Sequence, residues 1–224
     1  RFCGPVGGVK ADSAVDVGPL EYCILEDLKA RGPRVMAVLD PGKVVLTNYP
    51  EGQTEMAVLE NNPENPEAGT REVPFTRNLY IEREDFMEHP VKKFFRMTPG
   101  KEVRLKGAYI VRCDEVIRNE DGSIREIHCT CDMDSRSGTP GSDRKVKGTL
   151  HWVSAETAVN LTVRLHDYLI HPEDQDDGRD FMDKINPQSL TVMKAKGEPA
   201  ILQYHKGCPL YTSPSPRART SLRM

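Results

Sequence analysis

The residues best suited to bind another molecule lie between Val91 and Arg112, where cationic side chains are concentrated. This segment has seven basic residues against one acid, Glu102. The basic residues are Lys92, Lys93, Arg96, Lys101, Arg104, Lys106 and Arg112. The whole chain of 224 residues is slightly acidic, with 31 Lys and Arg, 34 Asp and Glu, and a net charge of −3. Such a local excess of charge is expected of a docking surface for phosphates, or of a solvated strand face.

Two aromatic residues, Phe94 and Phe95, stand within this basic segment and decide between the two interpretations. We expect residues 94–112 to form a basic strand, in which neighbouring side chains face opposite ways. One phenyl ring then packs in the core, and the other faces the ligand. Because aromatic rings stack on unpaired bases, the combination favours a nucleic-acid surface over a merely solvated face.

Residue types that support catalysis form no familiar pattern. The sequence has no phosphate-binding loop and no dinucleotide, zinc-protease or serine-hydrolase motif. Its six histidines are scattered, and its six cysteines include no C-x-x-C pair. Cys129 and Cys131 are expected on one strand face, but a zinc site needs two further ligands, so buried, reduced cysteines are expected. We predict no active site, metal or cofactor within this chain.

One helix is predicted near the start of the chain, over Pro19–Arg31. Pro19 suits its first position, and Gly32 suits its C-terminal cap. Leu20, Ile24 and Leu28 recur at helical spacing and predict one apolar face.

Short strands and turns follow this helix. The predicted strands are Val35–Leu39, Lys43–Thr47, Leu79–Ile81, Val103–Arg118, Ser123–Cys131, Val159–Leu165 and Ser189–Val192. The first two are expected to be joined by a tight turn, and Asp121-Gly122 is a strong hairpin signal. This pattern predicts a mainly β fold built from barrel or sandwich modules. The mean hydropathy is −0.55 and no apolar run is long enough to cross a bilayer.

Several motifs in a consistent order carry a resemblance to a known family. They are PRVMAVLDP at 33–41, REVPF at 71–75, GKEVRL at 100–105, KVKGTLHWVSA at 145–155 and INPQSL at 185–190. They resemble the anticodon-binding region of glutaminyl-tRNA synthetases, over roughly residues 1–199. The helix that contains Leu20–Ile24 is similar to the connector between that family's catalytic core and its two β-barrels.

The resemblance implies two β-barrels preceded by a short helical connector to a catalytic core that lies outside this sequence. The implied divisions are a connector at 1–32, a discontinuous proximal barrel at 33–61 and 146–207, a distal barrel at 62–145, and a tail at 208–224. The tail is rich in Ser, Pro and Arg and stands where the family has a closing strand. We interpret it as translated adapter sequence; a genuine basic RNA-binding tail is the alternative. Without the closing strand, marginal stability is expected.

Three arginines match anticodon contacts of the family. The resemblance assigns Arg34 to the middle base, Arg96 to the third and Arg104 to the first, and planar guanidinium groups suit this reading of unstacked bases. Further candidates for RNA backbone or base contacts are Lys92, Lys93, Phe94, Lys101 and Lys106. The chain departs from the family at Lys93 and Phe95, where Gln and Lys are usual, so Phe95 removes one donor.

The resemblance also implies the partners and the wider activity. The intact protein would ligate glutamine to its tRNA using ATP and Mg²⁺, as a cytoplasmic monomer with no membrane contact. The partners of this chain would be tRNA for glutamine and its own N-terminal catalytic domain. The alternatives are a glutamyl-tRNA synthetase of archaeal or eukaryotic type, a freestanding ribosomal-protein-like RNA-binding barrel, or a structural β-domain of another enzyme.

Overall fold

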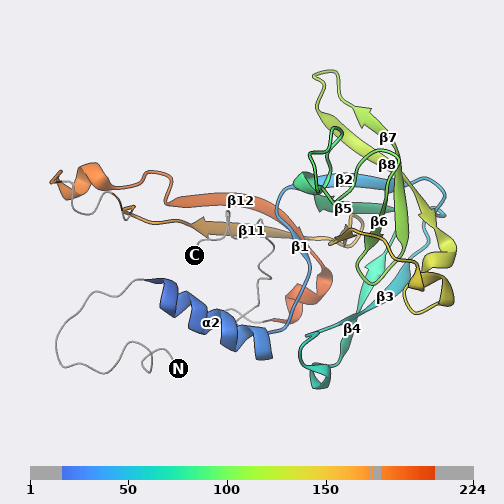
Figure 1. Cartoon of the computed structure of the whole chain (residues 1–224), viewed down its shortest axis with the longest axis horizontal. Helices are drawn as coiled ribbons and strands as arrows, with labels where there is room; N and C mark the ends of the chain where they lie inside the picture. Colours follow the sequence, from blue (N-terminus) through green and yellow to red (C-terminus); the bar gives the residue numbers. More distant parts are fainter. Residues whose placement is uncertain (1–16, 172, 174–177, 205–224) are drawn as a thin grey trace.

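The computed structural model describes residues 17–171, 173 and 178–204, and it is built mostly of strands (Figure 1). One α-helix, α2 (Val17–Arg31), begins two residues before the predicted start. The strands are β1 (Ala37–Val38), β2 (Pro41–Leu46), β3 (Glu55–Glu60), β4 (Thr70–Phe75), β5 (Asn78–Glu82), β6 (Glu102–Leu105), β7 (Ile110–Arg118), β8 (Ile124–Asp132), β9 (Thr149–Leu150), β10 (Val153–Ser154), β11 (Val159–His166) and β12 (Leu190–Gly197). The prediction of a mainly β fold is confirmed.

Short 3-10 helices occupy several of the connections between these strands. They are η1 (Pro66–Ala68), η2 (Arg83–Asp85), η3 (Met133–Ser135), η4 (Pro140–Asp143), η6 (Phe181–Lys184) and η7 (Pro199–Gln203). None of the helices in the part of the chain that the structure describes is long and apolar enough to cross a membrane.

The largest sheet has seven strands in the order β10-β5-β2-β8-β7-β6-β9. Its two edge strands, β9 and β10, belong to one six-residue segment, 149–154. Because β9 pairs with β6 and β10 pairs with β5, both edges of the sheet reach this same segment. The sheet therefore curves round into a barrel, and this closure removes free edges from the fold.

Trp152 fills the centre of this barrel, directly between β9 and β10. Its side chain is fully buried, and its indole Nε1–H donates to the Lys106 carbonyl at 2.9 Å. The Phe75 ring lies edge-on to it at 5.0 Å, and Tyr49 and Tyr109 each pack on Phe75 at 5.3 Å. Such edge-on aromatic contacts add to the free energy gained by burying the rings. This cluster forms the core that holds the curved sheet together.

The β3–β4 hairpin covers one end of the core (Figure 1). Ala57 and Leu59 of β3 and Val73 and Phe75 of β4 are buried in it. The turn between β6 and β7 passes so close to Leu59 that a Cβ at Gly107 would lie 2.1 Å from its side chain. Gly107 also has a positive φ of 68°, so both its space and its backbone favour glycine.

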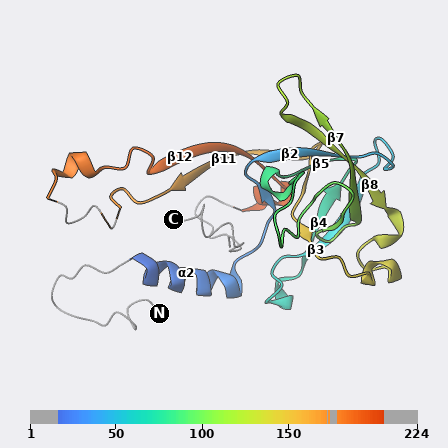
Figure 2. The ribbon, with the colours of Figure 1, turned by 45° about the horizontal axis from the view of Figure 1, so that its top comes forward.

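The remaining strands form a separate sheet in the order β1-β12-β11. β11 and β12 pair over eight residues and extend from the barrel as a long arm, with α2 on the same side of the barrel (Figures 1 and 2). Side chains of β11 alternate between half-buried and exposed along its whole length, which confirms the predicted alternation.

The predicted boundaries at residues 61/62 and 145/146 do not separate two sheets. The seven-stranded sheet contains β2 and β9 as well as β5–β8, and the β3–β4 hairpin spans residue 62. The structure therefore has a barrel over residues 41–154 and an arm built from β1, β11 and β12. The division into a proximal and a distal barrel stays a prediction.

The hairpin expected within residues 35–47 is wrong. β1 pairs with β12 in the arm, whereas β2 pairs with β5 and β8 in the barrel. The turn at Asp40 thus passes the chain from one sheet to the other. Backbone amides of Leu39 and Asp40 both donate to the Glu82 carboxylate, at 2.6 and 3.0 Å, which fixes the crossing point.

The apolar face predicted for the helix is not covered by the barrel. Leu20 and Ile24 are 39% and 42% exposed, and only Leu28 of the three is buried. The described contacts to the barrel gather at the C-terminal end of α2, where the buried Asn62 amide donates to the carbonyls of Lys29, Ala30 and Gly32 at 3.2–3.3 Å.

The predicted β7–β8 hairpin and the reduced cysteines are confirmed where the structure describes them. β7 and β8 are antiparallel around Asp121-Gly122, with Gly122 at a φ of 81°. Cys113, Cys129 and Cys131 are buried free thiols, and Cys23 is a half-buried one. Cys3 and Cys208 lie outside the described residues.

A buried hydrogen bond to a carboxylate predicts how stability depends on pH. The Tyr109 hydroxyl donates to Glu55 Oε2 at 2.6 Å. Burial raises the pKa of Glu55, but the hydrogen bond from Tyr109 and the charge of Arg136 outweigh it, so the pKa is lowered from 4.5. A lowered pKa contributes stability above the ordinary value and loses it as the pH falls through the folded value.

We therefore expect Tyr109→Phe to lower the free energy of unfolding by about 1.5–3 kcal/mol at pH 7, because a hydrogen bond to a charged group is lost. Urea unfolding at pH 7 and at about pH 3.5 checks this. The difference between Tyr109→Phe and the wild type must shrink at the lower pH. A difference that does not change with pH contradicts this account of Glu55.

Candidate nucleic-acid interface

An open groove of about 840 Å³ collects most of the basic segment. Its walls come from residues 90–96, residues 100–103, Arg112 and residues 145–148. The basic side chains that line it are Lys92, Lys93, Arg96, Lys101, Arg112, Lys145 and Lys147. The one acid in the lining, Glu102, is 3.2 Å from the Arg144 guanidinium, which offsets its charge. The groove is therefore a cationic surface suited to a chain of phosphates.

The expectation of one basic strand over residues 94–112 is wrong. Residues 94–98 lie in turns and isolated bridges, β6 covers Glu102–Leu105, and β7 starts only at Ile110 after a turn. The Met97 amide donates to the Asp85 carbonyl at 2.9 Å, and the Gly100 amide donates to the Cys113 carbonyl at 2.7 Å. These bonds tie the loop to the barrel. Basic side chains thus surround a hollow instead of following one strand.

Phe94 and Phe95 differ in exposure, as expected, although no strand alternation causes it. Phe94 is half-buried, whereas Phe95 is 51% exposed and lines the groove. Just before them, Lys93 has a positive φ of 68°, a conformation that is uncommon for a residue with a side chain. Phe94 and Lys93 both line the groove, so the prediction that they contact RNA stays open.

Arg96 lies in the groove and is held there by a buried acid. Its guanidinium forms an ion pair with Asp85, whose side chain is only 5% exposed, while Arg96 itself is 28% exposed. Asp85 belongs to η2, directly after β5. An ion pair of this kind fixes the direction of the guanidinium, and the exposed part is available to a base or phosphate.

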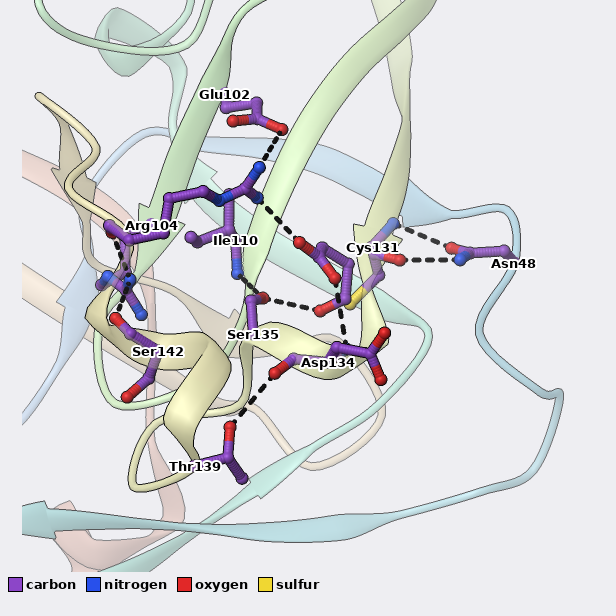
Figure 3. A network of polar contacts seen from close by, with 11 residues as sticks. Asn48, Glu102, Arg104, Ile110, Cys131, Asp134, Ser135, Thr139 and Ser142 are labelled. Atoms are coloured by element: carbon purple, nitrogen blue, oxygen red, sulfur yellow. Dashed lines mark hydrogen bonds and ion pairs between the residues drawn. The ribbon is translucent and has the colours of Figure 1, made fainter.

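Arg104 sits at the side of the groove and is not part of its described lining. Its Nη2 donates to the carbonyls of Ser142 and Arg144 at 2.6 and 3.1 Å, as Figure 3 shows for Ser142. The neighbouring η3 turn is held by Ser135, which accepts from the Ile110 amide at 2.8 Å (Figure 3). In this structure Arg104 therefore binds the loop after β8.

Arg34 lies in a different place, beside the end of α2. Its guanidinium is 3.1 Å from Glu64 and 19% exposed, and its amide donates to the Asn61 carbonyl at 2.8 Å. The Glu64 amide in turn donates to Asn62 Oδ1 at 2.9 Å. The three arginines predicted as anticodon contacts thus do not converge on one pocket, and their assignment to individual bases stays a prediction.

Lys106, a further predicted contact, faces a buried ionic cluster and not the groove. Burial lowers its pKa, and the nearby guanidinium groups of Arg71 and Arg34 lower it further, against an opposing effect of Glu198. Lys92 and Lys101, by contrast, are exposed residues of the groove lining.

Sequence reasoning did not assign Lys145 and Lys147 to the site. They reach the groove because β9 pairs in parallel with β6, which places residues 145–148 beside residues 102–104. The signal in the sequence is their spacing of two, which points two cations to one side of an extended segment. The partner of that segment is chosen by long-range pairing and leaves no local mark.

No group of three or more His, Cys, Asp or Glu side chains in the described ranges is arranged to hold a metal ion. The chemistry of the groove is therefore that of cations and aromatic surface.

Comparison with known families agrees with this geometry. Residues 32–132 match a family model described as tRNA synthetases class I (E and Q), anticodon-binding domain. Residues 149–209 match a second model with the same description. Together the two matches cover more than half of the chain and include every segment that lines the groove, apart from residues 145–148.

Curated relatives extend the likeness across nearly the whole chain. The chain is 52% identical to a glutamine–tRNA ligase of Clostridium perfringens, over 89% of this chain and 36% of the relative. It is 48% identical to one of Rhodopirellula baltica, over 90% of this chain and 34% of the relative. It is 44% identical to one of Salmonella newport, over 90% and 36%. The chain thus spans about a third of the length of these relatives. It belongs to the anticodon-binding domain family of the class I tRNA synthetases of the E and Q types.

Proposed function

We propose that this chain recognises the anticodon of tRNA for glutamine, as part of a glutamine–tRNA ligase. The observation that carries the proposal is the groove, in which seven basic side chains and an exposed phenyl ring surround one hollow. Single-stranded RNA is bound by this combination, since cations follow the backbone and rings or guanidinium planes receive the unstacked bases. The relatives that are named glutamine–tRNA ligases support glutamine over glutamate.

The whole ligase would use ATP and Mg²⁺ to join glutamine to its tRNA in the cytoplasm, in a catalytic domain that the chain itself does not describe. A surface suited to that domain is present on α2, where Leu20, Tyr22 and Ile24 are 39%, 65% and 42% exposed. Apolar residues gathered on one helix are commonly covered by a partner. Contacts to the anticodon would then favour a productive arrangement of the active site through α2, a form of induced fit.

Binding of the full chain to tRNA with the glutamine anticodon tests this proposal. The affinity is compared, by fluorescence anisotropy, with that for the same tRNA changed at each anticodon base in turn. We expect each change to weaken binding by about 5- to 150-fold, because a good base contact is worth about 1–3 kcal/mol. A tRNA changed outside the anticodon loop is the control. Binding that is salt-sensitive but equal for all these tRNAs would reduce the groove to a general phosphate track.

The arginine variant that tests the site most cleanly is Arg96→Lys. It keeps a positive charge beside the buried Asp85, which is 5% exposed at its side chain, but loses the planar fork. We expect discrimination at the third anticodon base to fall toward the value for a mismatched base, while the other two bases are still distinguished. Arg83→Lys is the matched control, because Arg83 is 51% exposed and pairs with Asp40 outside the groove. Equal behaviour of the two variants would contradict the role of Arg96.

A further inference from the structure

Phe95 is a large apolar side chain that stays half exposed in the most cationic surface of the barrel. It is 51% exposed, and it lines the groove between residues 90–96 and 145–148. An isolated exposed phenyl ring needs no explanation by itself. Two further observations show that this ring is held in place and paired with a cation.

The backbone at Phe95 is fixed by close contact with the facing segment. A Cβ on Gly148 would lie 2.3 Å from the Phe95 carbonyl oxygen, so only glycine allows the two backbones to approach so closely. The Gly148 carbonyl in turn accepts from the Arg104 amide at 2.8 Å, which anchors the segment to β6. Phe95 is therefore carried by a loop that is clamped to the barrel.

A cation lies over the ring of Phe95. Lys147 Nζ is 5.5 Å from the ring centroid, within the range of a cation–π interaction. Lys147 is itself exposed and lines the groove. The pair thus offers an apolar plane and a mobile ammonium group side by side. A nucleotide has the matching parts, a flat base and a phosphate.

We propose that Phe95 stacks on one unpaired base of the anticodon loop, while Lys147 binds a phosphate beside that base. The inference rests on the proposed function and adds to it a residue that helps to position the RNA. Stacking depends on a π face and on no hydrogen-bond pattern, so Phe95 contributes affinity for a splayed base of any identity. Discrimination between bases is left to the arginines.

The test measures the affinity of wild type, Phe95→Leu and Phe181→Leu for the anticodon stem-loop RNA. Leucine keeps an apolar side chain but removes the ring, and the exposed position of Phe95 leaves the fold intact, which a thermal melt verifies. Phe181, 56% exposed in η6 and outside the groove lining, is the matched control. We expect Phe95→Leu to weaken binding about 10-fold, within the range known for base stacking, and Phe181→Leu to leave it unchanged.

A second arm identifies the stacked base. The same proteins are measured with stem-loops that carry an abasic nucleotide at each loop position in turn. At one position, loss of the base must cost the wild type about as much as Phe95→Leu costs on intact RNA, and the two changes together must cost no more. In addition, Lys147→Gln is expected to reduce the slope of log affinity against log salt by about one phosphate.

The outcomes separate this inference from the proposed function. If the wild type distinguishes anticodons but Phe95→Leu behaves like Phe181→Leu, the stacking role is wrong and the proposed function stands. If Phe95→Leu weakens all abasic RNAs and the intact RNA equally, the ring does not stack on a loop base. If the wild type is blind to the anticodon, the proposed function itself fails.

Discussion

Replacing Arg71 with methionine is expected to lower the free energy of unfolding by about 3–5 kcal/mol, because it leaves a buried carboxylate without its partner. Arg71 Nε is 2.5 Å from Glu198 Oε1, and the side chains are 10% and 0% exposed. The guanidinium also donates to Glu198 Oε2 at 3.3 Å and to the Glu60 carbonyl at 2.8 Å. This ion pair joins β4 of the barrel to the end of β12 in the arm.

Urea unfolding followed by circular dichroism measures the effect, with Arg83→Met as the matched control. Arg83 and Asp40 form a pair 3.2 Å apart, but both are about half exposed, so its loss should cost less than about 1 kcal/mol. The double variant Arg71→Met with Glu198→Met removes the stranded charge and should recover much of the loss. An effect of Arg71→Met no larger than that of Arg83→Met would show that the buried pair does not hold the arm to the barrel.

Trp152→Ala is expected to be about as destabilising, by about 3–5 kcal/mol, because it empties the centre of the barrel. The ring is fully buried between the two strands that close the sheet. Its loss also leaves the Lys106 carbonyl without the indole donor at 2.9 Å. Trp152→Phe keeps most of the apolar contact with Phe75 and should cost about 1–3 kcal/mol, the range for an unsatisfied buried polar group.

The control for Trp152 is Tyr22→Ala, an exposed aromatic residue on α2. Tyr22 is 65% exposed, and its replacement should change the free energy of unfolding by no more than about 0.5 kcal/mol. Because the chain has one tryptophan, circular dichroism must replace intrinsic tryptophan fluorescence for the Trp152 variants. A loss at Trp152→Ala below about 1 kcal/mol would contradict the closed barrel.

Local patterns predicted those parts of the fold that local chemistry determines. The hairpin around Asp121-Gly122 follows from turn residues that favour positive φ, and β11 follows from strict alternation. The turn at Asp40 has equally good local signals but joins two different sheets. The choice of a strand's partner depends on residues far along the chain, and periodicity does not record it.

The candidate site shows the same division. The excess of Lys and Arg between Val91 and Arg112 predicted a cationic surface, and the groove confirms one there. Its shape was not predictable, because the segment 145–148 joins it through the parallel β6–β9 pairing. The side chain exposed at the rim, Phe95, also depends on a loop conformation that strand alternation does not describe.

The most direct test of the central claim is a crosslink between the anticodon and the groove. A tRNA with the glutamine anticodon, carrying 4-thiouridine at each anticodon position in turn, is bound to the full chain and irradiated. The crosslinked peptides are then identified by mass spectrometry. The account predicts crosslinks within residues 90–104 and 145–148, which line or adjoin the groove. Crosslinks confined to the β11–β12 arm, from a complex that still distinguishes anticodons, would contradict it.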